Sequence, residues 1–176
     1  MDGRFRTPRA AVAALLVVAA LTACSRASPS TAPAPSSTLR LPPPPVGGFD
    51  PPVRVSVEGA PTLIAEVARR PDQRARGLMQ RSELADDAGM VFLFPARGEG
   101  GFYMLGTLIP LSIAYVDGDR VVSTAEMRPC PGQICRSYPP SGPYTMAVEA
   151  PAGFFSRHGV RPGSVIRIIG ETAAPE

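Results

Sequence analysis

The sequence contains no tryptophan, no lysine and a single histidine, His158. Without lysine, no side-chain amine is available to form a Schiff base. With one histidine and no second pair of cysteines, the usual Cys and His ligand sets of zinc sites are not indicated. We therefore expect neither a metal nor a cofactor.

The sequence also lacks an apolar run that is comfortably long enough to span a bilayer. Residues 10–21 are apolar and follow a start that carries three arginines, the arrangement of a signal peptide. The run ends in Leu-Thr-Ala-Cys, which closes at Cys24 and resembles the bacterial lipobox. The resemblance implies cleavage before Cys24 and a diacylglyceryl group on its sulfur, so that the acyl chains (palmitate or similar) hold the protein on the membrane.

We thus expect residues 1–23 to be a lipoprotein signal peptide and the mature protein to lie on the extracytoplasmic face of the cell membrane. An uncleaved N-terminal anchor and an ordinary signal are the alternatives. Cleavage would leave a nearly neutral chain, because the signal holds three of the 18 basic residues and one of the 15 acidic ones. The remaining charges are interspersed, so we expect no nucleic-acid partner.

Proline marks the next segment. Of the 22 prolines, nine lie within residues 25–52, among many Ser, Thr and Ala residues. Such a stretch cannot bury enough apolar surface to fold. We therefore expect residues 24–52 to be a lipidated cysteine with a disordered linker, residues 53–171 to be one globular domain, and residues 172–176 to be a tail.

Short apolar segments, many with period-two alternation, dominate the globular part. The expected strands cover residues 53–57, 62–68, 90–94, 101–104, 111–116, 120–127, 144–149 and 164–169. The sequence predicts a helix over residues 71–78, a possible helical turn at 82–87 and another turn at 151–158. We expect Pro95 to end its strand, Asp117-Gly118-Asp119 to form a hairpin, and residues 128–143 to be a loop. About eight short strands with one or two short helices predict a compact, mainly β domain, sheet or barrel-like.

Cys130 and Cys135 remain once Cys24 is assigned to lipid. Four residues separate them, including a Pro-Gly turn, and an extracytoplasmic compartment is oxidising. The spacing differs from that of a thioredoxin-type redox pair. We expect a structural disulfide that holds one loop, with a metal site as the alternative.

Short motifs follow one another along nearly all of residues 53–170. They include Arg-Ala-Arg-Gly-Leu-Met-Gln-Arg at 74–81, Gly-Met-Val-Phe at 89–92, Phe-Tyr-Met at 102–104, Thr-Leu-Ile-Pro-Leu at 107–111, Pro-Cys at 129–130, Glu-Ala-Pro-Ala-Gly-Phe at 149–154 and Pro-Gly at 162–163. This succession resembles the family called domain of unknown function 192. The resemblance implies a small, mainly β domain that is often exported and has no established activity.

One segment departs from the usual pattern of that family, which reads Phe-Trp-Met-Lys-Asn-Thr and then Pro-Leu-Asp. Here the Trp, Lys, Asn and Asp positions hold Tyr103, Leu105, Gly106 and Ser112. We therefore expect no function that requires that Lys or Asp.

Five residues are candidates for ligand binding. Arg74 and Arg81 can bind a carboxylate or phosphate through two parallel hydrogen bonds. Phe102, Tyr103 and Thr107 can form an apolar or sugar-stacking platform. The alternatives are a solvated helix face whose arginines pair with nearby acids, and aromatic residues that belong to the core. The acids considered for that pairing are Asp72, Glu83, Asp86 and Asp87.

The case for an enzyme is weaker. His158 is expected at a helix end, and no nucleophile motif accompanies it. Glu66, Glu126 and Glu149 are scattered acids without a pattern that selects a pair. The leading hypothesis is a non-enzymatic cell-envelope domain that binds a wall glycan, a peptide or an envelope protein. An envelope hydrolase or transferase that uses carboxylates and His158, and an assembly factor for exported proteins, are the alternatives.

Overall fold

The structure is a computed structural model, and it describes residues 48–132 and 134–171. Cys24, the expected signal peptide, most of the expected linker and the expected tail lie outside the described residues. Within the part of the chain that the structure describes, no helix is long and apolar enough to cross a membrane.

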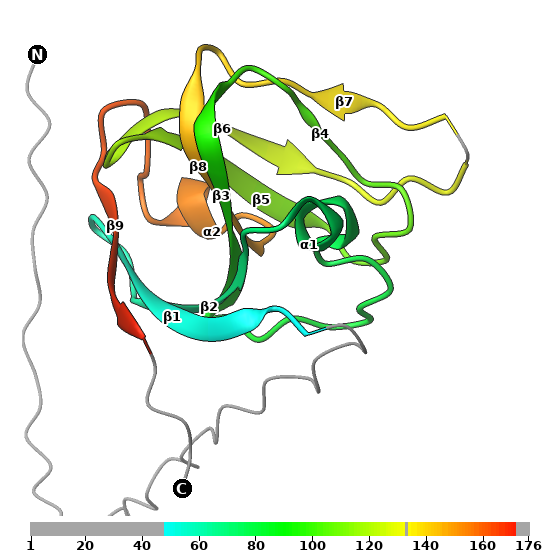
Figure 1. Cartoon of the computed structure of the whole chain (residues 1–176), viewed down its shortest axis with the longest axis horizontal. Coiled ribbons are helices and arrows are strands. Elements are labelled where there is room, and N and C mark those ends of the chain that lie inside the picture. Colours follow the sequence, from blue (N-terminus) through cyan, green and yellow to red (C-terminus); the bar gives the residue numbers. More distant parts are fainter. Residues whose placement is uncertain (1–47, 133, 172–176) are drawn as a thin grey trace, which may run out of the picture. The chain divides into compact units, whose positions relative to one another are not determined.

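Within residues 48–132 and 134–171, nine strands form two sheets, and two short helices accompany them (Figure 1). The larger sheet is curled and has the strand order β6-β5-β8-β3-β2-β1-β9. Only β2 and β3 run parallel; the other neighbouring strands are antiparallel. The elements are β1 (Asp50–Val57), β2 (Leu63–Ala68), α1 (Pro71–Arg76), β3 (Ala88–Gly98), β4 (Phe102–Tyr103), β5 (Leu111–Asp117), β6 (Arg120–Met127), β7 (Ser137–Tyr138), β8 (Tyr144–Pro151), α2 (Phe154–Arg157) and β9 (Ile166–Glu171).

Both faces of the central strands are covered. One face carries the valines of β1 and β2 and is closed by Phe154 and Phe155 of α2. The opposite face carries Met90 and Phe92 of β3 together with residues of β5 and β8. We call this second face the α1 face, because Leu78, which follows α1, packs on it. Strands buried on both faces read as continuous apolar runs, which explains the composition of β3, β5 and β8.

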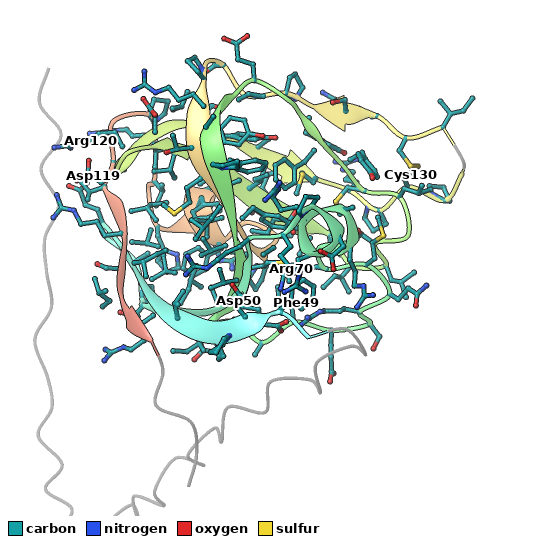
Figure 2. All side chains as sticks on the ribbon, viewed as in Figure 1. Phe49, Asp50, Arg70, Asp119, Arg120 and Cys130 are labelled. Atoms are coloured by element: carbon teal, nitrogen blue, oxygen red, sulfur yellow. A yellow bond between two sulfur atoms is a disulfide. The ribbon has the colours of Figure 1, made fainter. Side chains whose placement is uncertain are left out.

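The side chain of Gln73 fixes the start of α1. Its Oε1 accepts hydrogen bonds from the backbone N–H groups of Arg69 and Arg70, at 2.9 and 2.8 Å. Its Nε2 donates to Asp50 Oδ1 at 3.2 Å, and Asp50 also forms ion pairs with both arginines. Figure 2 shows Asp50 and Arg70 close together at the start of β1. The helix is thereby held against the edge of the domain at which β1 begins.

The mainly β prediction is confirmed, and two of the differences lie at the ends of elements. Helix α1 ends at Arg76 and does not reach 78, because Gly77 takes a positive φ of 50°. Strand β1 begins at Asp50, inside the expected linker, where Asp50 is held by α1.

Three further expectations were wrong in detail. Strand β3 continues through Pro95 to Gly98, because its pairing with β8 is interrupted between Leu93 and Gly98 and no ladder hydrogen bond from Pro95 is needed. Residues 82–87 form no helix; they lead through a turn into β3. The expected loop at 128–143 contains β7, which pairs with β4.

Candidate functional site

Two glutamates lie in one row across the α1 face of the sheet. Glu66 of β2 pairs with Met90 of β3, and Met90 pairs with Glu149 of β8. Directly paired residues of neighbouring strands point to the same face of a sheet. Both side chains are therefore directed toward the core of this face, and both residues are buried, at 6% and 5% exposure.

Glu66 is fully engaged within the protein. Arg81 Nη1 and Nη2 donate to Glu66 Oε1 and Oε2, both at 2.7 Å. Such a bidentate pair compensates for the burial of both charges. The guanidinium of Arg81 also lies 6.0 Å from the centre of the Phe49 ring.

Glu149 lies in a different environment. Among residues 48–132 and 134–171, no side chain forms a hydrogen bond or ion pair with its carboxyl group, and no fully enclosed side-chain oxygen lacks a partner, so the carboxyl group is open to the neighbouring pocket. Burial raises the pKa of Glu149 from its ordinary value of 4.5 to about 8, because a low-dielectric surrounding disfavours the charged form. The group is therefore mostly protonated at neutral pH and able to donate a hydrogen bond.

Glu149 lines a pocket of about 260 Å³ on the α1 face. Its apolar wall is a cluster of aromatic rings in edge-to-face contact: Phe92 and Phe102 (4.9 Å between ring centres), Phe94 and Tyr144 (5.1 Å), and Tyr115 and Tyr144 (4.9 Å). Of these rings, all except Tyr115 line the pocket. The hydroxyl of Tyr144 donates to Gly100 O at 2.7 Å, which holds the segment before β4 over the rings. A hollow with aromatic walls and few polar groups is typical of small-molecule sites.

The end of α1 supplies the basic side of the pocket. Arg74 and Arg76 both line it. Arg74 Nη1 donates to Leu93 O at 3.1 Å and to Arg69 O, and its guanidinium carbon lies 5.0 Å from the centre of the Phe94 ring. Arg74 is thus fixed against the aromatic wall with its charge beside the pocket.

The segment after Gly101 forms the remaining wall. At Gly101, a Cβ would lie 3.0 Å from both Pro139 Cα and Tyr138 O of the backbone, so glycine eases this close approach of the segment before β4 to β7. Phe102 and Thr107 line the pocket, and Thr107 is buried. Tyr103 also lines it but keeps 50% of its surface exposed.

Four of the five predicted ligand-binding residues line this one pocket: Arg74, Phe102, Tyr103 and Thr107. Arg81 does not line it, because its guanidinium is committed to Glu66. That acid was not among the partners considered for Arg81.

Sequence reasoning missed three aromatic residues of the pocket and the role of its acid. Phe92, Phe94 and Tyr144 read as ordinary strand residues, and only folding brings them beside Phe102. A signal for Glu149 did exist. It is the one charged residue in β8, a strand whose other residues are apolar except for Thr145.

The alternative based on His158 finds no support in this geometry. His158 Nδ1 lies 2.8 Å from Phe154 O, and the imidazole packs against the Phe154 ring. It lines a separate hollow together with Asp86 and Asp87. Glu126 accepts hydrogen bonds from Ser112 Oγ and Gly153 N, so it too is engaged elsewhere.

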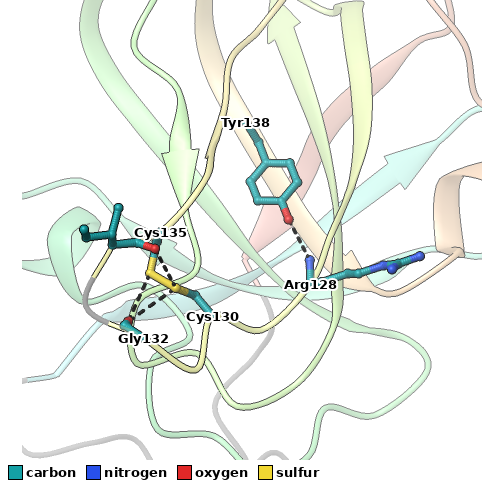
Figure 3. The surroundings of a disulfide bond; sticks show 6 residues. Arg128, Cys130, Gly132, Cys135 and Tyr138 are labelled. Carbon is teal, nitrogen blue, oxygen red and sulfur yellow. Dashed lines mark hydrogen bonds between the residues drawn. A yellow bond between two sulfur atoms is a disulfide. The ribbon is translucent and has the colours of Figure 1, made fainter.

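Cys130 and Cys135 form the predicted disulfide (Figure 3). The loop that it closes leads into β7, where the hydroxyl of Tyr138 accepts a hydrogen bond from Arg128 N at 3.0 Å. Because β7 pairs with β4, this loop supports the strand that carries Phe102. Among the described residues, no group of three or more His, Cys, Asp or Glu side chains is arranged to hold a metal ion.

Residues 53–168 match the family model DUF192, described as uncharacterized ACR. The chain belongs to this family. A protein of unknown function from Novosphingobium aromaticivorans DSM 12444, known from a crystal structure, is 34% identical, with a TM-score of 0.63, and the match covers 70% of this chain and 89% of that one. A proposed transcription regulator from Sinorhizobium meliloti 1021 is 26% identical, with a TM-score of 0.59, and the match covers 68% of this chain and 95% of that one. No curated protein matches the chain.

Proposed function

We propose that this DUF192 domain is a non-enzymatic binding domain that holds a small ligand in the pocket between α1, the segment 100–107 and the α1 face of the sheet. The observation that carries the proposal is the buried carboxyl group of Glu149, which lines an aromatic hollow and has no partner among the described residues. Because no enclosed side-chain oxygen among the described residues lacks a partner, this carboxyl group opens into the pocket, where a ligand can reach it. A ligand there can exchange a hydrogen bond with Glu149.

Binding is favoured over catalysis because the described lining of the pocket holds one carboxyl group and no histidine or cysteine. Its charged lining residues are Arg74, Arg76 and Glu149. Arginine remains protonated and does not exchange protons at physiological pH. General acid–base chemistry usually pairs two titratable groups with separated pKa values. Beside Glu149 the described lining offers the hydroxyl groups of Tyr103 and Tyr144, and that of Tyr144 is engaged with Gly100 O.

Features of the sequence support a location outside the cell for this binding domain. The lipobox that ends at Cys24 supports a diacylglyceryl anchor on the extracytoplasmic face of the membrane, and the proline-rich residues 25–52 would let the domain reach away from it. The ligand would then be a component of the cell envelope, such as a fragment of a wall glycan or a peptide.

Two variants test the pocket. Ala75 lines it and is exposed, so Ala75→Trp should fill the entrance and abolish binding of small aromatic compounds. Ala96→Trp is the control, because it places the same side chain at an exposed position of β3 that does not line the pocket. This variant should bind the aromatic compounds as the wild type does. Binding is read from the 13C-methyl NMR signals of Met79 and Thr107, which line the pocket. Equal binding by both variants would contradict the proposal.

The anchor is tested separately. Wild-type protein should be found in the membrane fraction with an acylated Cys24 detected by mass spectrometry, and Cys24→Ser should release the protein. A soluble wild-type protein without acylation would contradict the lipid anchor, but it would not bear on the proposed binding pocket.

Assembly of exported proteins is a second candidate function, favoured by apolar side chains beside the pocket. Tyr103, Leu105 and Leu108 expose 50%, 42% and 59% of their surfaces. Exposed apolar side chains in one short segment are typical of protein contacts. In this case Leu105→Glu with Leu108→Glu should reduce the binding of unfolded apolar polypeptides, whereas Ala75→Trp should leave it unchanged.

A further inference from the structure

The pocket has two chemically different ends. Arg74 lies at the end where Phe94 and Tyr144 meet. Glu149 lies at the other end, because its partner in the sheet is Met90, four residues before Phe94 on the same strand. Four residues of strand span about 13 Å.

The middle of the pocket is apolar. The ring of Phe92 lies between the two ends on β3, and the ring of Phe102 meets it at 4.9 Å. Rings at this spacing are in direct contact, so a flat apolar group can pack beside them rather than between them. A ligand that fits all three parts is therefore amphipathic along its length.

The charges of the pocket select the sign of the ligand. Two arginines line it, and no described carboxylate lies within ion-pair distance of Arg74. Guanidinium groups bind carboxylates through directed, charge-assisted hydrogen bonds. Glu149 does not offset this positive charge at neutral pH, because burial keeps most of it protonated. An ammonium group entering this end of the pocket would meet the guanidinium of Arg74.

On the basis of the proposed function, we infer that the pocket binds an amphipathic carboxylate. Its carboxylate lies beside Arg74, its apolar body packs on Phe92 and Phe102, and a hydroxyl or carbonyl oxygen at its far end accepts a hydrogen bond from Glu149. The inference deepens the proposed function by naming the class of ligand.

Three small probes of similar shape test this class. They are 3-(4-hydroxyphenyl)propionate, which carries both groups, 3-phenylpropionate, which lacks the hydroxyl, and tyramine, which has an ammonium in place of the carboxylate. The full-length protein is titrated at pH 7, and the methyl signal of Met79 reports binding. The methyl of Met146, which belongs to the opposite core, serves as the internal reference.

We expect 3-(4-hydroxyphenyl)propionate to bind at least about tenfold more tightly than tyramine. Arg74→Met should remove this preference, and Arg74→Lys should keep it. Both variants alter the contact of Arg74 with Leu93 O, so their comparison isolates the effect of the positive charge. Arg54→Met removes an exposed arginine outside the pocket and should change nothing. Glu149→Leu should abolish the preference for the hydroxylated probe over 3-phenylpropionate.

The contrary results are distinct. If tyramine binds as tightly as 3-(4-hydroxyphenyl)propionate or more tightly, the ligand class is wrong while the pocket remains a binding site. Equal weakening by Arg74→Met and Arg54→Met would likewise overturn the class, because the effect would then reflect the overall charge. If none of the probes moves the Met79 signal at millimolar concentration, the inference and the proposed function both fail.

Discussion

Glu66 and Glu149 are the same residue type, equally buried, in one row of one sheet face, and separated only by Met90. Glu66 is closed off by two hydrogen bonds from Arg81. Glu149 faces a hollow without a described partner, and its pKa is raised to about 8. The difference teaches that burial of an acid does not define its role. The surroundings of its carboxyl group define that role: Arg81 makes Glu66 part of the structure, whereas the pocket leaves Glu149 accessible to a small molecule.

The largest expected effect is on the Glu66 side. Arg81→Met leaves a buried carboxylate without its cation, which should lower the free energy of unfolding by about 3–5 kcal/mol. The double variant Glu66→Leu with Arg81→Met removes both charges and should recover most of this loss. Urea denaturation measures the free energy of unfolding of the single and the double variant.

Arg167→Met is the matched control for this comparison, since it breaks an exposed ion pair with Asp119. It should have little effect on stability. If Arg81→Met were equally mild, the Glu66 pair would not be the structural element that we describe.

The second effect is a pH dependence that belongs to Glu149. Its pKa is higher in the folded state than in the unfolded chain, so between about pH 4.5 and 8 the folded protein binds the extra proton. Stability should therefore be greatest at the acidic side of this window and fall as the pH rises through it, by on the order of a few kcal/mol.

Glu149→Gln cannot ionise and should flatten this slope when unfolding free energies are compared at pH 5 and pH 8.5. The variant should be more stable than the wild type at the higher pH. An identical slope in the two proteins would mean that another group causes it.

The smallest effect concerns the wall of the pocket. Tyr144→Phe removes the hydrogen bond to Gly100 O, and the net loss should be about 0.5–1.5 kcal/mol. Because Gly100 precedes β4, we also expect faster amide hydrogen exchange near Phe102. Unchanged exchange there would show that this bond does not hold the segment over the rings.

The sequence predicted the mainly β fold because apolar alternation and turn residues are local signals, as in β1 and in the hairpin around Gly118. It also named four residues that line one pocket, through their chemical types. Two features could not be read from it. The partner of Arg81 is 15 residues away in the chain, and the pairing of β3 with β8 joins Met90 to Glu149 across more than fifty residues. Such long-range contacts leave no local pattern.

The central claim is that Glu149 is a buried acid held neutral at a ligand pocket, and its own titration tests this most directly. The carboxyl carbon of Glu149 can be followed by 13C NMR between pH 3 and 10, with Glu149→Gln used to assign the signal. The account predicts a midpoint at about 8. A midpoint near the ordinary value of 4.5 would show that the carboxyl group is solvated or paired, and would contradict the account.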